Sequence, residues 1–211
     1  MLKKSFERGG EPLLERVLER GSLIPELLTS ADVFRQLQAP IKEYLDLMAI
    51  VKKSQGKLGS LERIRFANFW ALNTLRPSRD LRERFFTLLE NTYLIQHGDV
   101  NKVMQELKPL ARNAYLFSHA TKLLHSVDPS LPIIDSKVTK FFHLPSLPYQ
   151  SKNLDRRCWY LERYTLLKNA YRTLESSREI KLTFENIESL VPDFAEISFA
   201  KKIDSVITDA L

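Results

Sequence analysis

The stretch LFSHATKLLHSVDPSLPIIDSKVTKFF, residues 116–142, contains the pattern that decides the fold. Its first part predicts a helix that runs to about Val127, because apolar residues recur there at helical spacing. The two prolines within 128–132 then predict a turn. Asp135 follows at an N-cap position, directly ahead of a second predicted helix over 136–142. This helix, turn and capped helix indicate a helical protein.

The rest of the chain supports an all-α fold. Six glycines in 211 residues are few for tight β-hairpins, whose turns need positive backbone angles. We expect one globular multi-helix domain over residues 1–211, with possible lobes over 1–97 and 98–211. The further predicted helices cover 11–20 (ended by Gly21), 30–37, 40–51 (opened by Pro40), 61–75, 80–95, 99–107 (capped by Asp99), 154–176, 183–190 (capped by Thr183) and 198–211.

The composition favours a globular protein with a net positive field. Hydrophobic residues make up 44% of the chain, enough for one sizeable core. The formal charge of +6 favours approach to phosphate backbones, although excesses of this size are also common in proteins without a nucleic-acid partner. We find no stretch typical of a signal peptide or a membrane span. We therefore expect a cytoplasmic protein with no membrane partner, in which the single cysteine, Cys158, stays reduced.

Motifs of the common metal and nucleotide sites do not occur. The four histidines lack the spacing of zinc ligands, and there is no glycine-rich phosphate loop or nucleophile elbow. We therefore expect neither a metal nor another cofactor.

Basic and aromatic residues alternate in two segments, 63–84 and 156–164. Such mixtures can hold phosphates and stack bases, but they are also typical of amphipathic helices with arginines in water and aromatic rings in the core. Lys137 and Lys140 are better phosphate candidates, because they follow Asp135 at a predicted helix start, as Ser136 does.

Residues 116–125 and 131–138, within a match of about 113–142, resemble the catalytic core of helix-hairpin-helix DNA glycosylases, most closely the archaeal 8-oxoguanine DNA glycosylase branch. In that family an aspartate caps the helix after a Pro-apolar element and stabilises positive charge on the sugar as the base departs. Asp135 occupies this place. The resemblance implies a glycosylase-like two-lobed helical arrangement, DNA binding and a role in DNA repair. Without it, Asp135 would be interpreted as an ordinary helix cap.

The resemblance also assigns positions for a lysine nucleophile. Bifunctional members of the family attack the sugar with a lysine amine at the start of the preceding helix. The matching position here holds Tyr115, and Lys122 resembles a second lysine within that helix. A tyrosine forms no imine, so strand cleavage would require Lys122 to act from a shifted register; a monofunctional enzyme, in which Asp135 activates water, is the alternative. The family's Gly-x-Gly hairpin is also missing between Gly98 and Lys122.

We therefore expect a glycosylase-like helical protein that binds nucleic acid, possesses degenerate or altered base-excision activity, and has doubtful lyase activity. Its catalytic candidates are Asp135 and Lys122, and its nucleic-acid candidates are Ser136, Lys137 and Lys140. A helical protein-interaction module without catalytic activity is one alternative, motivated by the abundance of aromatic residues. An enzyme acting on a small nucleobase or nucleoside is another.

Overall fold

The computed structural model describes residues 13–28, 31–72, 79–95, 99–111, 116–145 and 156–209, and within these ranges it contains helices, turns and loops but no β-strand. The predicted all-α class is therefore confirmed. The α-helices are α1 (Leu13–Ser22), α2 (Ile24–Leu27), α3 (Ala31–Ser54), α4 (Ser60–Phe69), α5 (Arg79–Ile95), α6 (Val100–Leu107), α7 (Phe117–Val127), α8 (Ser136–Phe141), α9 (Arg156–Glu175), α10 (Arg178–Leu190) and α11 (Phe199–Asp209). Two 3₁₀ segments, η3 (Lys108–Ala111) and η4 (Pro192–Glu196), complete the described elements.

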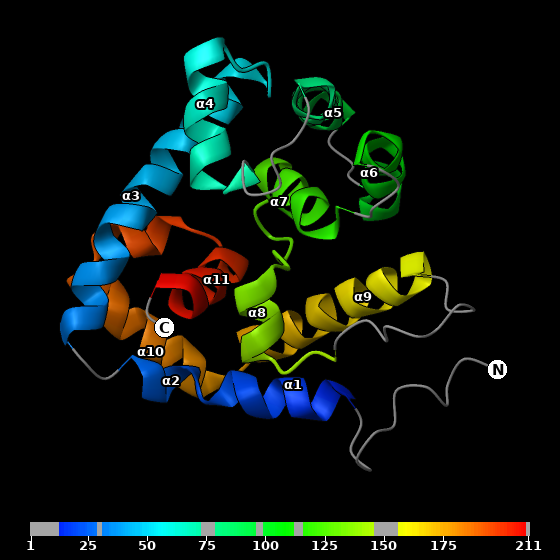
Figure 1. Cartoon of the computed structure of the whole chain (residues 1–211). Helices are drawn as coiled ribbons and strands as arrows, with labels where there is room; N and C mark the ends of the chain where they lie inside the picture. Colours follow the sequence, from blue (N-terminus) through cyan, green and yellow to red (C-terminus); the bar gives the residue numbers. More distant parts are fainter. Residues whose placement is uncertain are drawn as a thin grey trace.

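Three helices, α7, α8 and α11, occupy the middle of the molecule, and the others surround them (Figure 1). Helix α1 packs on α9, α3 packs on α11, and both α5 and α6 pack on α7. The first and last parts of the chain therefore lie together, and the buried side chains form one continuous core. The lobes expected over 1–97 and 98–211 stay a prediction, and residues 97 and 98 at their boundary lie outside the described ranges. Nowhere in those ranges is a helix both long and apolar enough to cross a membrane.

The prediction that one helix ends and another begins at Pro40 is wrong. Helix α3 is one continuous helix of 24 residues, and Pro40 lies inside it. Proline in a helix interior removes one backbone hydrogen bond and crowds the preceding turn. Burial offsets that cost here: Leu37, Ile41 and Tyr44 lie on one stripe and are almost completely buried on either side of the proline.

Two other local signals also misplace helix ends. Gly21 does not end α1; it lies within the helix, and a Cβ added to it would come within 2.6 Å of Leu174 Cδ1 on α9. This glycine thus allows α1 and α9 to approach closely. Thr183 does not cap α10, which begins at Arg178 with Ser177 as its N-cap. The Thr183 hydroxyl instead donates to the Glu179 carbonyl inside the helix.

Helix α4 covers the first part of the helix predicted over 61–75. Phe66, Ala67 and Trp70 are buried, whereas the apolar side chains of Leu61 and Ile64 are 82% and 58% exposed. The described helix also ends at Phe69, ahead of the predicted end at residue 75, and residues 73–78 lie outside the described ranges.

The caps and turn near the middle of the chain are confirmed. The Asp99 carboxylate accepts from the Asn101 amide at 2.8 Å and starts α6. In the proline-bounded turn, Asp128 accepts from both the amide and the hydroxyl of Ser130. Asp135 caps α8, so the central pattern of the sequence folds as predicted.

Candidate active site

The carboxylate of Asp135 is fixed by the start of α8. Its backbone is extended, and its Oδ1 accepts from the amides of Lys137 and Val138 at 2.9 and 3.0 Å. The preceding segment is tied to α7, because the buried Ile134 amide donates to Thr121 Oγ1 at 3.1 Å. Asp135 is therefore held by its own helix and, through Ile134, by the neighbouring one.

Lys122 comes next to Thr121 on α7 and extends toward the same carboxylate. Its Nζ lies 4.0 Å from Asp135 Oδ2 and donates to the Trp70 carbonyl at 2.9 Å. The two side chains are 13% and 19% exposed. Because Oδ1 carries the cap, Oδ2 is the oxygen that faces the amine. The structure thus brings together both residues predicted from the sequence as catalytic candidates.

The environment of Lys122 favours the neutral amine more than water does. Burial lowers the pKa of Lys122, and the positive charge of Lys201 lowers it further, while the negative charges of Asp135 and Asp204 raise it; burial is the largest effect. An amine with a lowered pKa is more often unprotonated near neutral pH and can then act as a nucleophile.

Tyr44, His125 and the Leu131 carbonyl form a buried hydrogen-bonded bridge. The Leu131 carbonyl can only accept, so His125 Nδ1, 2.7 Å away, carries the proton and donates to it. His125 Nε2 is then an acceptor for the Tyr44 hydroxyl at 3.0 Å. Burial lowers the pKa of His125 to about 4, which keeps the ring neutral, and raises the pKa of Tyr44. The bridge anchors the turn that leads to Asp135.

A second lysine–aspartate pair lies in α11, which the sequence interpretation did not single out. Lys201 Nζ donates to Asp204 Oδ2 at 2.7 Å, and both side chains are 5% exposed. The sequence signal for this pair is a lysine and an aspartate three residues apart in a predicted helix.

The predicted nucleic-acid residues lie at the surface of α8. Ser136, Lys137 and Lys140 are exposed. The Lys137 ammonium donates to the Thr208 carbonyl near the end of α11, which ties the two helices together. The amides of Lys137 and Val138 are occupied by Asp135, so these two backbone donors are not available to a phosphate.

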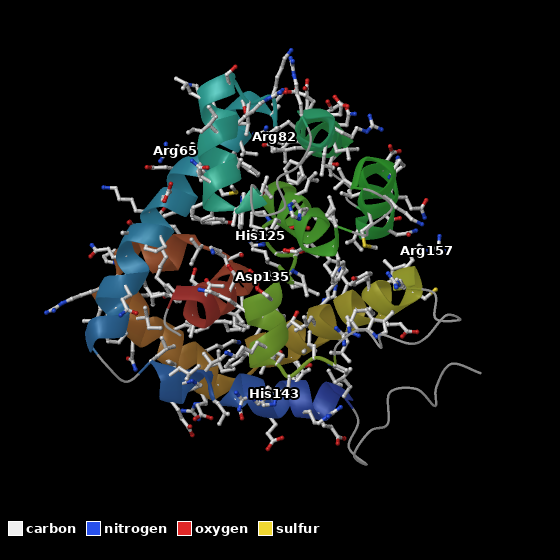
Figure 2. The ribbon with its side chains drawn as sticks, in the orientation of Figure 1. Arg65, Arg82, His125, Asp135, His143 and Arg157 are labelled. Carbon is white, nitrogen blue, oxygen red and sulfur yellow. The ribbon has the colours of Figure 1, made fainter. Side chains whose placement is uncertain are left out.

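The two basic and aromatic segments differ from each other. In the first, Arg63 pairs with Glu83 at 2.7 Å on the surface while Phe66 and Trp70 are buried, so these aromatic rings belong to the core and are not available to stack on bases. In the second, Arg163 is itself buried, with its guanidinium carbon 3.2 Å from the centroid of the Trp159 ring. Figure 2 shows Asp135 and His125 in the middle of the molecule and Arg65, Arg82 and Arg157 toward its edge.

Other predicted features are only partly described by the structure. Tyr115, at the family's lysine position, lies outside the described ranges. Cys158 is of intermediate exposure. The described residues include no cluster of His, Cys, Asp and Glu able to hold a metal ion. No family model matches the chain, and neither a curated protein nor a solved structure matches it.

Proposed function

We propose that this chain is a DNA glycosylase-like helical protein in which Lys122 and Asp135 act on the sugar of a nucleotide. The observation that carries the proposal is the 4.0 Å separation between Lys122 Nζ and Asp135 Oδ2, two largely buried groups from different elements. The proposal includes a two-lobed, glycosylase-like arrangement of the helices and an altered base-excision chemistry, since the amine comes from position 122 and not from 115.

The pair supplies the two groups that cleavage of an N-glycosidic bond needs. The neutral Lys122 amine attacks C1′ of the sugar, the C1′–N bond breaks, and its electron pair and a proton leave with the base. When the sugar ring then opens at C1′, an imine forms between C1′ and Lys122 Nζ. The Asp135 carboxylate opposes the positive charge that develops on the sugar during this step.

A hydrolytic alternative uses the same carboxylate without a covalent intermediate. Asp135 Oδ2 then accepts a proton from a water molecule that attacks C1′, and Lys122 only contributes charge. Both routes need the nucleotide turned out of its stack, because the glycosidic bond is covered in a duplex. The net charge of +6 and the exposed Lys137 and Lys140 support approach of the DNA backbone to this side of α8.

Single-turnover incubation with end-labelled duplexes that carry 8-oxoguanine, uracil or an abasic site tests the proposal. We expect base release by the wild type and its loss in Asp135→Asn. Borohydride should trap a protein–DNA adduct that is absent from Lys122→Gln; Lys202→Gln, a change on the neighbouring α11, is the matched control. Release without trapping would select the hydrolytic route.

Two results would overturn parts of this proposal. DNA binding without release or trapping would remove the catalytic part. Equal affinity of the wild type and a Lys137→Glu/Lys140→Glu variant for duplex DNA would remove the proposed binding side of α8.

One observation favours a second candidate, a protein-interaction module. Leu61 and Ile64 lie three residues apart on α4 and are 82% and 58% exposed. Adjacent large apolar side chains on a surface are typical of contact sites for another protein or a second copy. Light scattering at high concentration tests self-association, which Leu61→Lys/Ile64→Lys should abolish. A monomeric wild type that also recovers no specific partner in a pull-down would remove this candidate.

A further inference from the structure

The buried Lys201–Asp204 pair lies inside a cage of aromatic rings. The Lys201 Nζ is 5.2, 5.8 and 5.6 Å from the ring centroids of Tyr44, Phe69 and Trp70. Attraction between the ammonium and these rings offsets part of the cost of removing it from water. A buried ion pair nevertheless stabilises a fold little compared with apolar side chains of similar volume. Its presence at the centre of the molecule therefore calls for a chemical explanation.

Two members of the cage connect this pair directly to the candidate active site. Trp70 contacts Lys201 with its ring and accepts from Lys122 Nζ with its carbonyl. Tyr44 contacts Lys201 with its ring and donates to His125, which in turn holds Leu131 ahead of Asp135. Displacement of the Lys201 ammonium would thus disturb the supports of both Lys122 and the turn before Asp135.

The charges of Lys201 and Asp204 also act on the Lys122 amine: Asp204 raises its pKa, and Lys201 lowers it. The titratable groups whose pKa values are coupled to Lys122 or to the pair lie on five helices: His119 and His125 on α7, Asp135 on α8, Lys201 and Asp204 on α11, Tyr44 on α3 and Tyr171 on α9. Burial lowers the pKa of both histidines and raises the pKa of both tyrosines, so these four groups are neutral near pH 7. The charges that remain around the amine are the two aspartates and Lys201.

Only one carboxylate oxygen of Asp204 accepts a hydrogen bond from a described residue. Its Oδ2 accepts from Lys201, but its Oδ1 is buried and has no hydrogen-bond partner among the residues that the structure describes. The negative charge therefore extends beyond the pair, in a region where low dielectric strengthens its effect on the Lys122 amine.

We propose that Lys201 and Asp204 are positioning residues for Lys122: through the aromatic cage they hold its amine against the Trp70 carbonyl. The opposite charges of the two residues act on the same amine. The inference rests on the proposed function only in taking Lys122 as the reacting group. Neither residue touches the substrate in this scheme.

A titration of Lys122 tests the inference without DNA. The protein is labelled with ¹³C-lysine, the Lys122 Cε resonance is identified by its loss in Lys122→Met, and its shift is followed with pH. Asp204→Asn removes a charge that favours the protonated amine, so the midpoint should move to lower pH. Lys201→Gln removes a charge that disfavours it, so the midpoint should move to higher pH. These two substitutions retain a hydrogen-bonding side chain at each position.

Controls separate a charge effect from a general disturbance of α11. Lys202→Gln removes the next lysine, whose amine instead pairs with Glu188 on α10, and should leave the midpoint unchanged. Asp204→Glu keeps both charges and should titrate like the wild type. If only one of the two charge variants folds, the direction of its midpoint shift is compared with the direction predicted for that variant.

The outcomes distinguish this inference from the proposed function. Unchanged midpoints, or shifts of the same sign in both charge variants, would overturn the inference whether or not the wild type releases a base. Failure of both charge variants to fold, while Lys202→Gln folds, would also overturn it, because the pair would then be a structural requirement. Opposite shifts in a protein that releases no base would keep the inference and remove the glycosylase proposal.

Discussion

Acid should destabilise the protein through His125, whose imidazole is completely buried. Burial lowers its pKa from 6.5 to about 4, so the unfolded state binds a proton before the folded state does. The stabilisation is thus complete above pH 6.5 and is lost as the pH falls through about 4. The difference between these pKa values corresponds to about 3 kcal/mol of unfolding free energy. That is a large share of the roughly 5–15 kcal/mol typical of a folded domain.

Urea unfolding of the wild type and His125→Gln, followed from neutral pH to about pH 4.5, measures this contribution. Glutamine can donate to Leu131 and accept from Tyr44 but does not titrate. We expect the variant to be less stable at neutral pH by about 1–3 kcal/mol, because its geometry is less suited to the bridge. The gap should narrow with falling pH, since only the wild type loses the histidine contribution. A gap that stays constant over this range would refute the reasoning.

Three further predictions concern stability and are measured by urea unfolding. Asp135→Ala should be less stable than Asp135→Asn by about 1 kcal/mol, since asparagine retains the cap of α8; equal values would contradict the role of Oδ1. Gly21→Ala should be stabilising by about 1 kcal/mol only in a Leu174→Ala background, because in the wild type the added Cβ would clash with Leu174. A gain in both backgrounds would show that the Leu174 side chain moves away at little cost. Lys201→Met should cost about 3–5 kcal/mol, and Lys202→Met, which breaks a less buried pair, about 1 kcal/mol or less; equal losses would contradict the difference in burial.

The features that the sequence predicts best are those whose causes lie within a few residues. The Asp99 and Asp135 caps each need only a carboxylate and the amides two or three residues further on. The turn over 128–132 likewise depends on its own prolines and on Asp128. These local hydrogen bonds form between residues at most three positions apart, so the local pattern is enough to predict them.

The errors occur where packing outweighs a local preference. Pro40 is tolerated inside α3 because the buried stripe from Leu37 to Tyr44 continues past it. Gly21 lies in the last turn of α1, where it permits the close approach of Leu174 on α9, a residue far away in the sequence. Helical spacing also places Leu61 and Ile64 on an apolar stripe, but no described element covers them. A single sequence does not state which neighbour a helix face will meet.

In the candidate site, too, individual residues could be predicted from the sequence, but their arrangement in space could not. Asp135 could be selected from local pattern and family resemblance, and Lys122 could be named as a candidate, but their separation depends on how the turn returns α8 to α7. The Lys201–Asp204 pair could not be connected with them, since α11 reaches the site only through tertiary packing around Tyr44 and Trp70. A lysine and an aspartate three residues apart on the apolar face of a predicted helix are the signal that would direct attention to such a pair in other sequences.

The two interpretations of Asp135, as an ordinary helix cap and as a catalytic carboxylate, do not exclude each other in this geometry. One oxygen satisfies two amides of α8, and the other faces the Lys122 amine. The cap fixes the direction of the second oxygen, so it would limit the reorganisation needed when positive charge develops nearby. Asp135→Asn keeps the cap and removes the charge, whereas Asp135→Ala removes both. A loss of base release that is equal in the two variants, beside unequal losses of stability, is therefore the combination that assigns the chemistry to the carboxylate charge and the folding contribution to the cap.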